Sequence, residues 1–82
     1  KIHPHLSEAI AKTIEMIREK RKMSKTSLAD FADIERCYLL DILKGRKRPT
    51  LNAIFSLCEA LQVHPVEFIR MVTDEMEKMK KS

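Results

Sequence analysis

Residues 24–45 read SKTSLADFADIERCYLLDILKG, and this stretch decides the fold. Ser24 precedes an apolar pattern, and its hydroxyl suits an N-cap because it can accept a hydrogen bond from the first turn of a helix. The inward positions of this short helix are Leu28, Ala29 and Ala32. Asp33 is expected to end the helix, because Asp adopts the left-handed backbone conformation more readily than most residues.

A second short helix is expected from Glu35 onward, with Leu39 and Ile42 on its inward face. Gly45 is the only glycine in the chain. It follows Lys44 directly, at a position where helices commonly end in a left-handed glycine. The two short helices are separated by roughly three residues, which is the spacing of a helix-turn-helix.

Helical patterns continue on both sides of this stretch. Ser7 is the expected N-cap of a preceding helix, whose apolar face is Leu6, Ile10, Ile14 and Ile17. Thr50 is expected to cap a following helix, whose inward face is Leu51, Ile54, Leu57, Cys58 and Leu61. His64 as N-cap and Pro65 at the first helical position begin a last helix, whose apolar stripe is Val66, Ile69, Val72, Met76 and Met79. The sequence therefore predicts five helices.

Length and composition favour one small helical domain. The chain has 82 residues, of which 44% are hydrophobic, as in a folded domain rather than a disordered one. One glycine and three prolines leave little material for hairpin turns. No apolar run is long enough to cross a membrane, and the N-terminus lacks an apolar signal core. We therefore expect a cytoplasmic protein with no membrane partner.

Positive charge is concentrated in two clusters, although the net charge is only +4. The first cluster is Arg18, Lys20, Arg21, Lys22 and Lys25. The second cluster is Lys44, Arg46, Lys47 and Arg48. If the chain doubles back between them, the clusters are expected to meet as one anion-binding surface. The alternative is two solvated charge runs without a partner.

A set of spaced positions between residues 23 and 68 forms a recognisable pattern. These positions are Met23-Ser24, Leu28-Ala29, Ala32-x-Ile34, Gly45-Arg46-Lys47-Arg48-Pro49-Thr50-Leu51, Leu57-x-x-Ala60-Leu61-x-Val63 and Phe68. The pattern resembles the helix-turn-helix family of Cro and the phage repressors, also called xenobiotic-response-element-like. The resemblance implies an all-α, five-helix lambda-repressor-like DNA-binding domain over residues 8–72. Residues 1–7 would be an N-terminal extension, and residues 73–82 a C-terminal helical extension.

The resemblance also implies which residues approach double-stranded DNA. Those expected to face the major groove are Glu35, Arg36, Cys37 and Leu40. Those expected to hold phosphates are Lys25, Lys44, Arg46, Lys47 and Arg48, which would supply affinity and set the register. Arg36 is the best base contact, because Arg can bind guanine through two hydrogen bonds. Glu35 would accept from cytosine, and Leu40 would touch a thymine methyl group.

Two functions follow as hypotheses. The first is a sequence-specific DNA-binding regulator, such as a repressor or an antitoxin that represses its own operon and binds a toxin. The second is a helical protein–protein interaction module, or an antitoxin-type partner, with little base readout. The second is favoured by departures from the family pattern, which has a Ser or Thr at Glu35, a polar residue at Leu40 and an acid at Leu43. These residues, with Cys37 and Asp41, would then form an acidic and apolar surface.

No constellation of catalytic residues or phosphate-binding loop is recognisable, so we expect a protein that is not an enzyme and needs no cofactor. His3-x-His5 is expected to be a chain end rather than a metal site. Cys58 is expected to be a buried thiol, and Cys37 a more exposed one.

The C-terminal stripe leaves three alternatives open. Its residues Ile69, Val72, Met76 and Met79 recur at heptad-like spacings of three, four and three. They are expected to pack back on the first helix, to form the seam of a homodimer, or to bind a separate protein.

Overall fold

The computed structural model describes residues 1–81 and contains five α-helices, as predicted, with no strand in that range. Their bounds are α1 Leu6–Lys20, α2 Lys25–Ala32, α3 Arg36–Leu43, α4 Leu51–Leu61 and α5 Pro65–Lys80. The expected all-α fold class is confirmed. None of these helices is both long enough and apolar enough to pass through a membrane.

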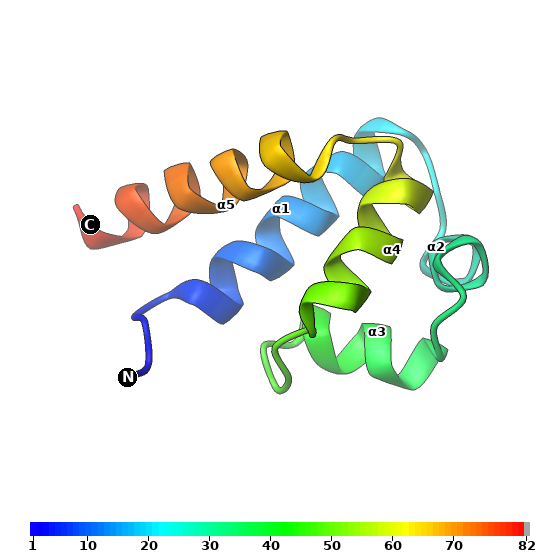
Figure 1. Ribbon diagram of the computed structural model, residues 1–82, viewed down its shortest axis with the longest axis horizontal. Helices are drawn as coiled ribbons and strands as arrows, with labels where there is room; N and C mark the ends of the chain where they lie inside the picture. The colour runs from blue at the N-terminus through cyan, green and yellow to red at the C-terminus, as the bar shows by residue number, and fades with distance from the viewer. Residues whose placement is uncertain (82) are drawn as a thin grey trace.

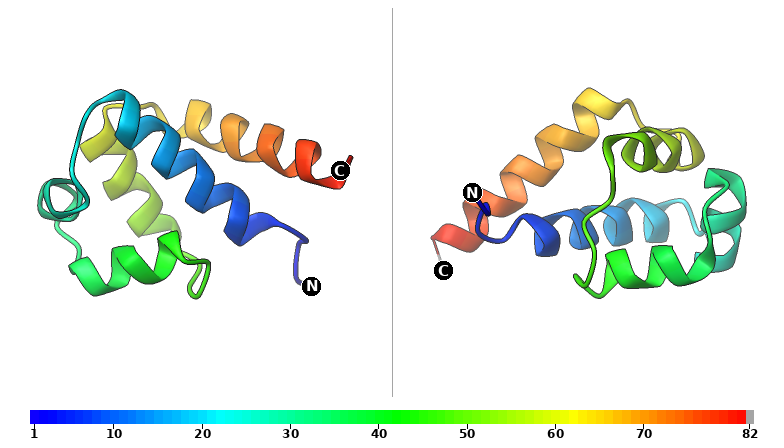
Figure 2. Two further views of the ribbon diagram at one scale, coloured as in Figure 1. Left: turned by 180° about the vertical axis from the view of Figure 1, so that it is seen from behind. Right: turned by 60° about the horizontal axis from the view of Figure 1, so that its bottom comes forward.

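The central helix of the fold is α1, which contacts both α3 and α5. Figures 1 and 2 show α3 on one side of α1 and α5 on the opposite side. The helix-turn-helix is completed by α2, which packs against α3 and α4. As a result, α3 and the α3–α4 connection lie far from the junction where α1 ends and α5 begins.

Most of the expected helix ends are confirmed. The Oγ of Ser24 accepts a hydrogen bond of 3.0 Å from the backbone N–H of Ser27. Asp33 has φ 55° and ψ 45°, in the left-handed region that lets the chain turn between α2 and α3. Gly45 has φ +75°, and a side chain at this position would be strained although there is open space for it. These residues fix the angle between the two helices of the motif.

The core contains most of the residues that the helical periodicity predicted to face inward. Four of them, from α2, α3 and α4, are at most 5% exposed: Leu28, Leu39, Ile54 and Leu61. Cys58 is also buried, and burial raises the pKa of its thiol to about 11, whereas Cys37 is exposed. The thiol of Cys58 therefore acts as a small apolar group.

Two expectations were wrong, one about the start of a helix and one about a helix face. The first helix starts at Leu6, so its N-cap is His5 in a left-handed conformation and not Ser7. The earlier start brings Leu6 against the core. Leu51 was expected to face inward but is 70% exposed. It occupies the first position of α4, beyond the edge of the core, whereas the inward face starts at Ala53 and Ile54.

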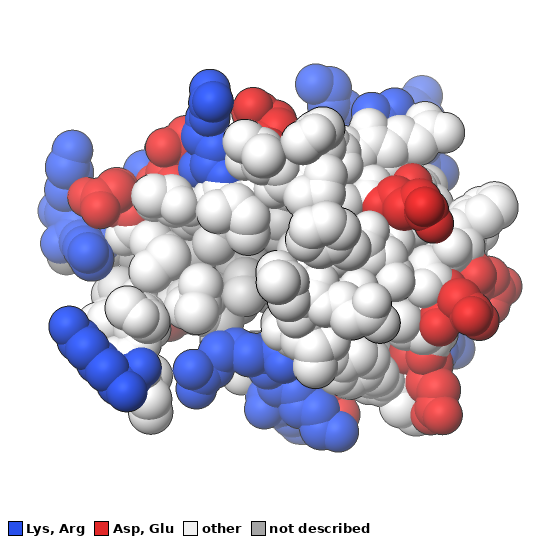
Figure 3. Space-filling view, in the orientation of Figure 1, with Lys and Arg blue, Asp and Glu red and all other residues white. Residues whose placement is uncertain are grey.

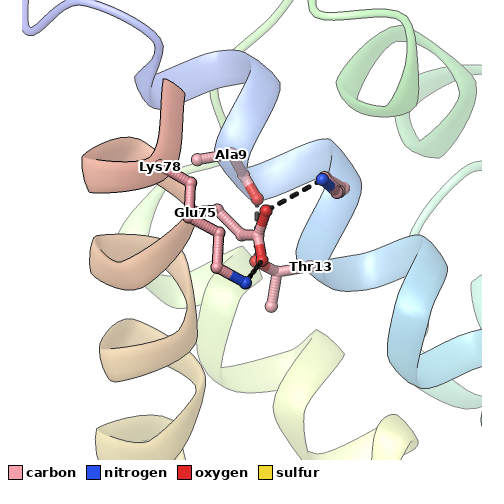
Figure 4. Close-up of polar contacts among 5 residues, drawn as sticks. Ala9, Thr13, Glu75 and Lys78 are labelled. Carbon is pink, nitrogen blue, oxygen red and sulfur yellow. Dashed lines mark hydrogen bonds and ion pairs between the residues drawn. The ribbon is translucent and has the colours of Figure 1, made fainter. Parts of the chain in front are cut away.

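A buried carboxylate joins α5 to α1 (Figure 4). Glu75 is 3% exposed, and Lys12 Nζ of α1 lies 3.1 Å from its Oε1 while Lys78 Nζ lies 3.3 Å from its Oε2. The ammonium group of Lys12 beside this carboxylate is the largest cause that lowers the pKa of Glu75, against the opposing effect of burial. Nearby, the hydroxyl of Thr13 donates to the carbonyl of Ala9 at 2.8 Å. The helical spacing did not predict this buried acid.

Candidate nucleic-acid interface

The exposed face of the molecule at α3 is formed mainly by the start of that helix. Glu35 is its N-cap residue, and it makes no side-chain hydrogen bond to the helix. Glu35, Arg36 and Cys37 are exposed, and Leu40 is partly exposed one turn further on. The structure therefore brings the four predicted reading residues together on one convex edge of the fold.

The backbone of the α3–α4 connection is held at both ends. The N–H groups of Arg46 and Lys47 donate to the carbonyl of Asp41 at 2.8 and 3.3 Å. At the other end the N–H of Thr50 donates to the hydroxyl of Tyr38 at 3.2 Å, and Thr50 Oγ1 caps α4. These contacts fix the path of the loop relative to α3, so its side chains project from a defined backbone.

The side chains of this loop are exposed and basic. Lys44, Arg46, Lys47 and Arg48 are all exposed. One acid lies close to them: Asp41 Oδ2 is 3.7 Å from Lys47 Nζ, and its Oδ1 is 4.0 Å from Arg46 Nη1. Ion pairs of that length between mobile side chains are weak. The loop therefore presents concentrated positive charge that an incoming anion can use.

Lys25 lies at the other end of the helix-turn-helix from this loop. It is the first residue of α2 and is exposed. Ser24 and Ser27, beside it, are hydrogen-bonded to each other through their hydroxyl groups at 3.0 Å. A backbone phosphate on the far side of α3 would find Lys25 and the first turn of α2 in this position.

Apart from Lys25, the first basic cluster does not share a surface with the loop, so the expectation of one common surface was wrong. Arg21 Nη2 donates to the carbonyl of Gln62, at the C-terminal end of α4, with a distance of 3.0 Å. The basic loop instead precedes Thr50, at the N-terminal end of α4. An 11-residue helix is roughly 16 Å long. Figure 3 shows blue side chains along the lower edge near the loop and again along the upper edge near the end of α1.

Arg18, from the first cluster, is engaged inside the fold. Its guanidinium donates to both carboxylate oxygens of Glu15 at 2.9 and 2.8 Å, and to the carbonyl of Met23 at 2.7 Å. The hydrogen bond from Arg18 is the largest cause that lowers the pKa of Glu15. This residue stabilises the turn between α1 and α2, and its charge is already compensated.

The predicted C-terminal stripe is divided between the core and the surface. Val72 is 3% exposed and belongs to the core, while Met76 and Met79 are partly buried against it. Ile69 is 48% exposed. Three of the four residues of the stripe therefore pack inside the fold, as the first alternative expected. Ile69 is the member of the stripe that is exposed to another chain.

Several residues of this region were missed by reasoning from the sequence. The hydroxyl of Tyr38 and the backbone carbonyl of Asp41 hold the loop. The apolar pattern of α3 does not show that these two groups point toward the loop. Phe31 and Phe55 are exposed aromatic residues, at 71% and 54%. The sequence did carry a signal for these two exposed residues, because each is an aromatic residue at a position outside the inward face of its helix.

The helix-turn-helix geometry agrees with the family to which the sequence belongs. Residues 14–68 match the helix-turn-helix family, and this chain belongs to it. The immunity repressor protein of Bacillus phage phi105 is 33% identical over 54 residues. The matched segment is 66% of this chain but only 38% of that repressor, so the chain corresponds to little more than a third of its relative.

Solved structures share the whole fold. The clp gene regulator ClgR from Corynebacterium glutamicum is 21% identical with a TM-score of 0.88, over 98% of this chain and 85% of that chain. The restriction-modification controller protein C.Esp1396I, solved as a tetramer with its natural 35 base-pair operator, is 23% identical with a TM-score of 0.81. That match covers 90% of this chain and 97% of the controller protein. At these identities the likeness concerns the fold.

Proposed function

We propose that this protein binds double-stranded DNA sequence-specifically and regulates transcription, most simply as a repressor. The observation that carries the proposal is the basic loop Lys44–Arg48, whose backbone is fixed to α3 while its side chains are exposed. Membership of the helix-turn-helix family and similarity to an immunity repressor support it. Such a protein acts where the DNA is, in the cytoplasm, and performs no catalysis.

In this proposal the loop and α2 hold the duplex from two sides of α3. Arg46, Lys47 and Arg48 bind phosphates of one strand, and Lys44 lies beside them at the end of α3. Lys25 binds a phosphate at the start of α2. These contacts are independent of sequence, and they set the depth and register of α3 in the major groove.

The start of α3 then reads the bases. Arg36 donates two hydrogen bonds to guanine, which discriminates against other bases by about 1–3 kcal/mol. Glu35 accepts from the amino group of cytosine, and Leu40 contacts a thymine methyl group. Cys37 is exposed between them and is small enough to let the helix approach the base edges.

A homodimer is the natural arrangement for such a reader. Two copies related by a two-fold axis would place their reading helices about 34 Å apart, one turn of duplex. The free apolar residues outside the core, including Ile69, offer surface for this contact. A partner protein such as a toxin would be a separate occupant of the surfaces away from DNA.

Selection from a library of random duplexes at low salt tests base readout. The native protein should enrich one sequence, and Arg36→Ala should relax the preference at one base pair while leaving affinity for random DNA nearly unchanged. Arg70→Ala is the matched control, because Arg70 is an exposed arginine on α5, away from α3. A library that returns no enriched sequence would contradict base readout.

One observation favours a second function, a protein-binding module without base readout. Asp41 lies beside the basic loop, Glu35 is exposed at the start of α3, and the partly exposed Leu40 and Leu43 lie on the same helix. Duplex DNA that binds without enrichment, or that does not bind at all, would favour this alternative.

A further inference from the structure

An open hollow of about 600 Å³ lies where α1 ends and α5 begins. Its apolar lining is Met16, Ile17, Val63 and Met71, and its charged lining is Lys20, Arg21 and Glu67. This junction is on the opposite side of α1 from α3 (Figures 1 and 2), so a duplex on α3 would leave it free. We call it the Met16 groove.

The apolar lining of the Met16 groove is open to solvent. Met16 is 43% exposed, and Met71 and Val63 are partly exposed. Methionine side chains are flexible and polarisable, and they are frequent where a surface must fit an apolar segment of another protein. Met16 of α1 and Met71 of α5 both line the groove and give it this adaptable character.

The rim of the groove carries the positive charge that the DNA-binding face does not use. Lys20 is exposed, and Arg21 is held in place by its hydrogen bonds to Gln62. Glu67 is the acid in the lining, and Arg70 Nε lies 3.9 Å from its Oε1. The rim is therefore net positive, with one cation fixed in position.

The apolar surface continues on the other side of Arg21. A second hollow of about 410 Å³ is lined by Arg21, Met23, Phe31, Glu59, Ala60 and Gln62. Phe31 is among the most exposed large apolar side chains in the described part of the chain. The two hollows share Arg21, so an elongated partner can contact both while it passes this guanidinium.

We propose that the Met16 groove binds an amphipathic helix of a different protein, one with an apolar stripe bordered by acidic residues. Apolar side chains at positions i, i+3 or i+4, and i+7 would lie on Met16, Val63 and Met71. Glu or Asp side chains beside that stripe would face Lys20 and Arg21. The site is separate from the proposed DNA interface and does not depend on it.

Charge and shape exclude the other occupants. A second copy docked symmetrically on this groove would bring like charges together, because both rims are basic. Duplex DNA would use the cations but leave the methionines exposed to water. A small ligand is usually enclosed in a cavity over most of its surface, whereas Met16 lies open.

A synthetic fluorescein-labelled peptide serves as the probe. It is a 16-residue helix, roughly 24 Å long, with leucines at i, i+4, i+7 and i+11 bordered by glutamates. Fluorescence anisotropy with the full chain should show saturable binding at micromolar concentrations. A peptide with every glutamate replaced by lysine should bind at least ten times more weakly.

Matched variants locate the site. Met16→Asp and Lys20→Glu should each weaken the peptide at least tenfold, and Met16→Gln should weaken it by a smaller factor. Ile2→Asp is the control, since Ile2 is an exposed apolar residue before α1 and does not line the groove. Thermal melts check that each variant folds, and their affinity for duplex DNA should equal that of the native protein.

Three results would overturn this proposal. One is the absence of saturable peptide binding, and another is binding that Met16→Asp and Lys20→Glu leave unchanged. The third is dissociation of a native dimer by Met16→Asp in sedimentation, because the groove would then be an interface between copies. None of these outcomes bears on duplex binding by the loop, so the two proposals fail separately.

Discussion

The two basic clusters have similar charge in the sequence and different surroundings in the structure. In the cluster at residues 44–48 the side chains are exposed, and Asp41 approaches two of them at 3.7 and 4.0 Å. In the cluster at residues 18–25 two arginines are already bonded, Arg18 to Glu15 and Met23, and Arg21 to Gln62. Only the cluster at residues 44–48 combines free charge with a fixed backbone beside α3.

This difference separates charge that stabilises the fold from charge that is available to a partner. Arg18 holds the turn after α1 by satisfying a carbonyl, as basic residues near helix ends often do. The long ion pairs with Asp41 leave most of the charge of the loop uncompensated, and the mutual repulsion of its side chains is unfavourable unless an anion binds. A basic side chain whose charge is already compensated within the chain, such as Arg18 beside Glu15, is not available to an anion.

The largest expected effect concerns the core residues that support α3 and the loop after it. Leu39 is fully buried in α3, so Leu39→Ala should lower the free energy of unfolding by roughly 2–4 kcal/mol, because it leaves a cavity. Leu51→Ala, at an exposed leucine, should change it by less than about 0.5 kcal/mol. Urea denaturation of both variants measures the two values. Equal effects would show that α3 does not rest on the core as described.

The next effect tests whether the first cluster is structural. Arg18→Met should lower the free energy of unfolding by about 1–2 kcal/mol, because it removes three charge-assisted hydrogen bonds from a largely buried position. Lys47→Met, in the exposed loop, should leave stability within about 0.5 kcal/mol of the native value. Denaturant unfolding at pH 7 compares the two.

The same pair predicts a pH dependence. Arg18 lowers the pKa of Glu15, so the stabilisation from this ion pair is fully present above the pKa of a glutamate in the unfolded chain, near about 4.3. This stabilisation is lost as the pH falls through the lower pKa that Glu15 has in the folded protein. The stability gap between the native protein and Arg18→Met should therefore shrink below about pH 4. A gap that stays constant down to pH 2 would mean that Glu15 is not the partner that matters.

A smaller effect concerns the acid beside the loop. Asp41→Asn removes a negative charge 3.7 Å from Lys47 while keeping the carbonyl that holds the loop. Affinity for duplex DNA should rise about threefold to fivefold, since an exposed ion pair contributes up to about 1 kcal/mol. Glu77→Gln, at an exposed acid on α5, is the control and should leave affinity unchanged. A loss of affinity in Asp41→Asn would mean that this carboxylate orders the loop.

The smallest effect concerns the turn of the motif. Asp33 has a left-handed backbone, so Asp33→Gly should raise the free energy of unfolding by about 0.5–1 kcal/mol by relieving that strain. The increase should appear in a thermal melt without a change in duplex affinity. A decrease would show that the aspartate side chain stabilises the turn more than its backbone strains it.

Local features of the chain were predictable because their causes are local. The hydroxyls of Ser24 and Thr50, the left-handed Asp33 and Gly45, and the spacing of apolar residues determine where the helices start and end. The composition of the basic loop was equally visible. A match spread over many spaced positions then predicted the correct family.

Features that depend on how helices cross were not predictable. Glu75 occupies a charged position in the pattern of α5 and is buried only because Lys12 of α1 meets it there. The separation of the basic clusters follows from the direction of α4, whose two ends lie beside different clusters. Leu51 is exposed because it lies beyond the edge of the core. The spacing of apolar residues within α4 does not show where the core ends.

The salt dependence of duplex binding tests the central claim most directly. Each phosphate contact that is lost should lower the slope of log affinity against log salt by about one unit. Arg46→Gln with Lys47→Gln should therefore lower the slope by about two units. Lys20→Gln with Lys22→Gln, an equal loss of charge from the other cluster, should leave it unchanged. Equal changes in slope for both double variants would contradict the assignment of DNA binding to the loop.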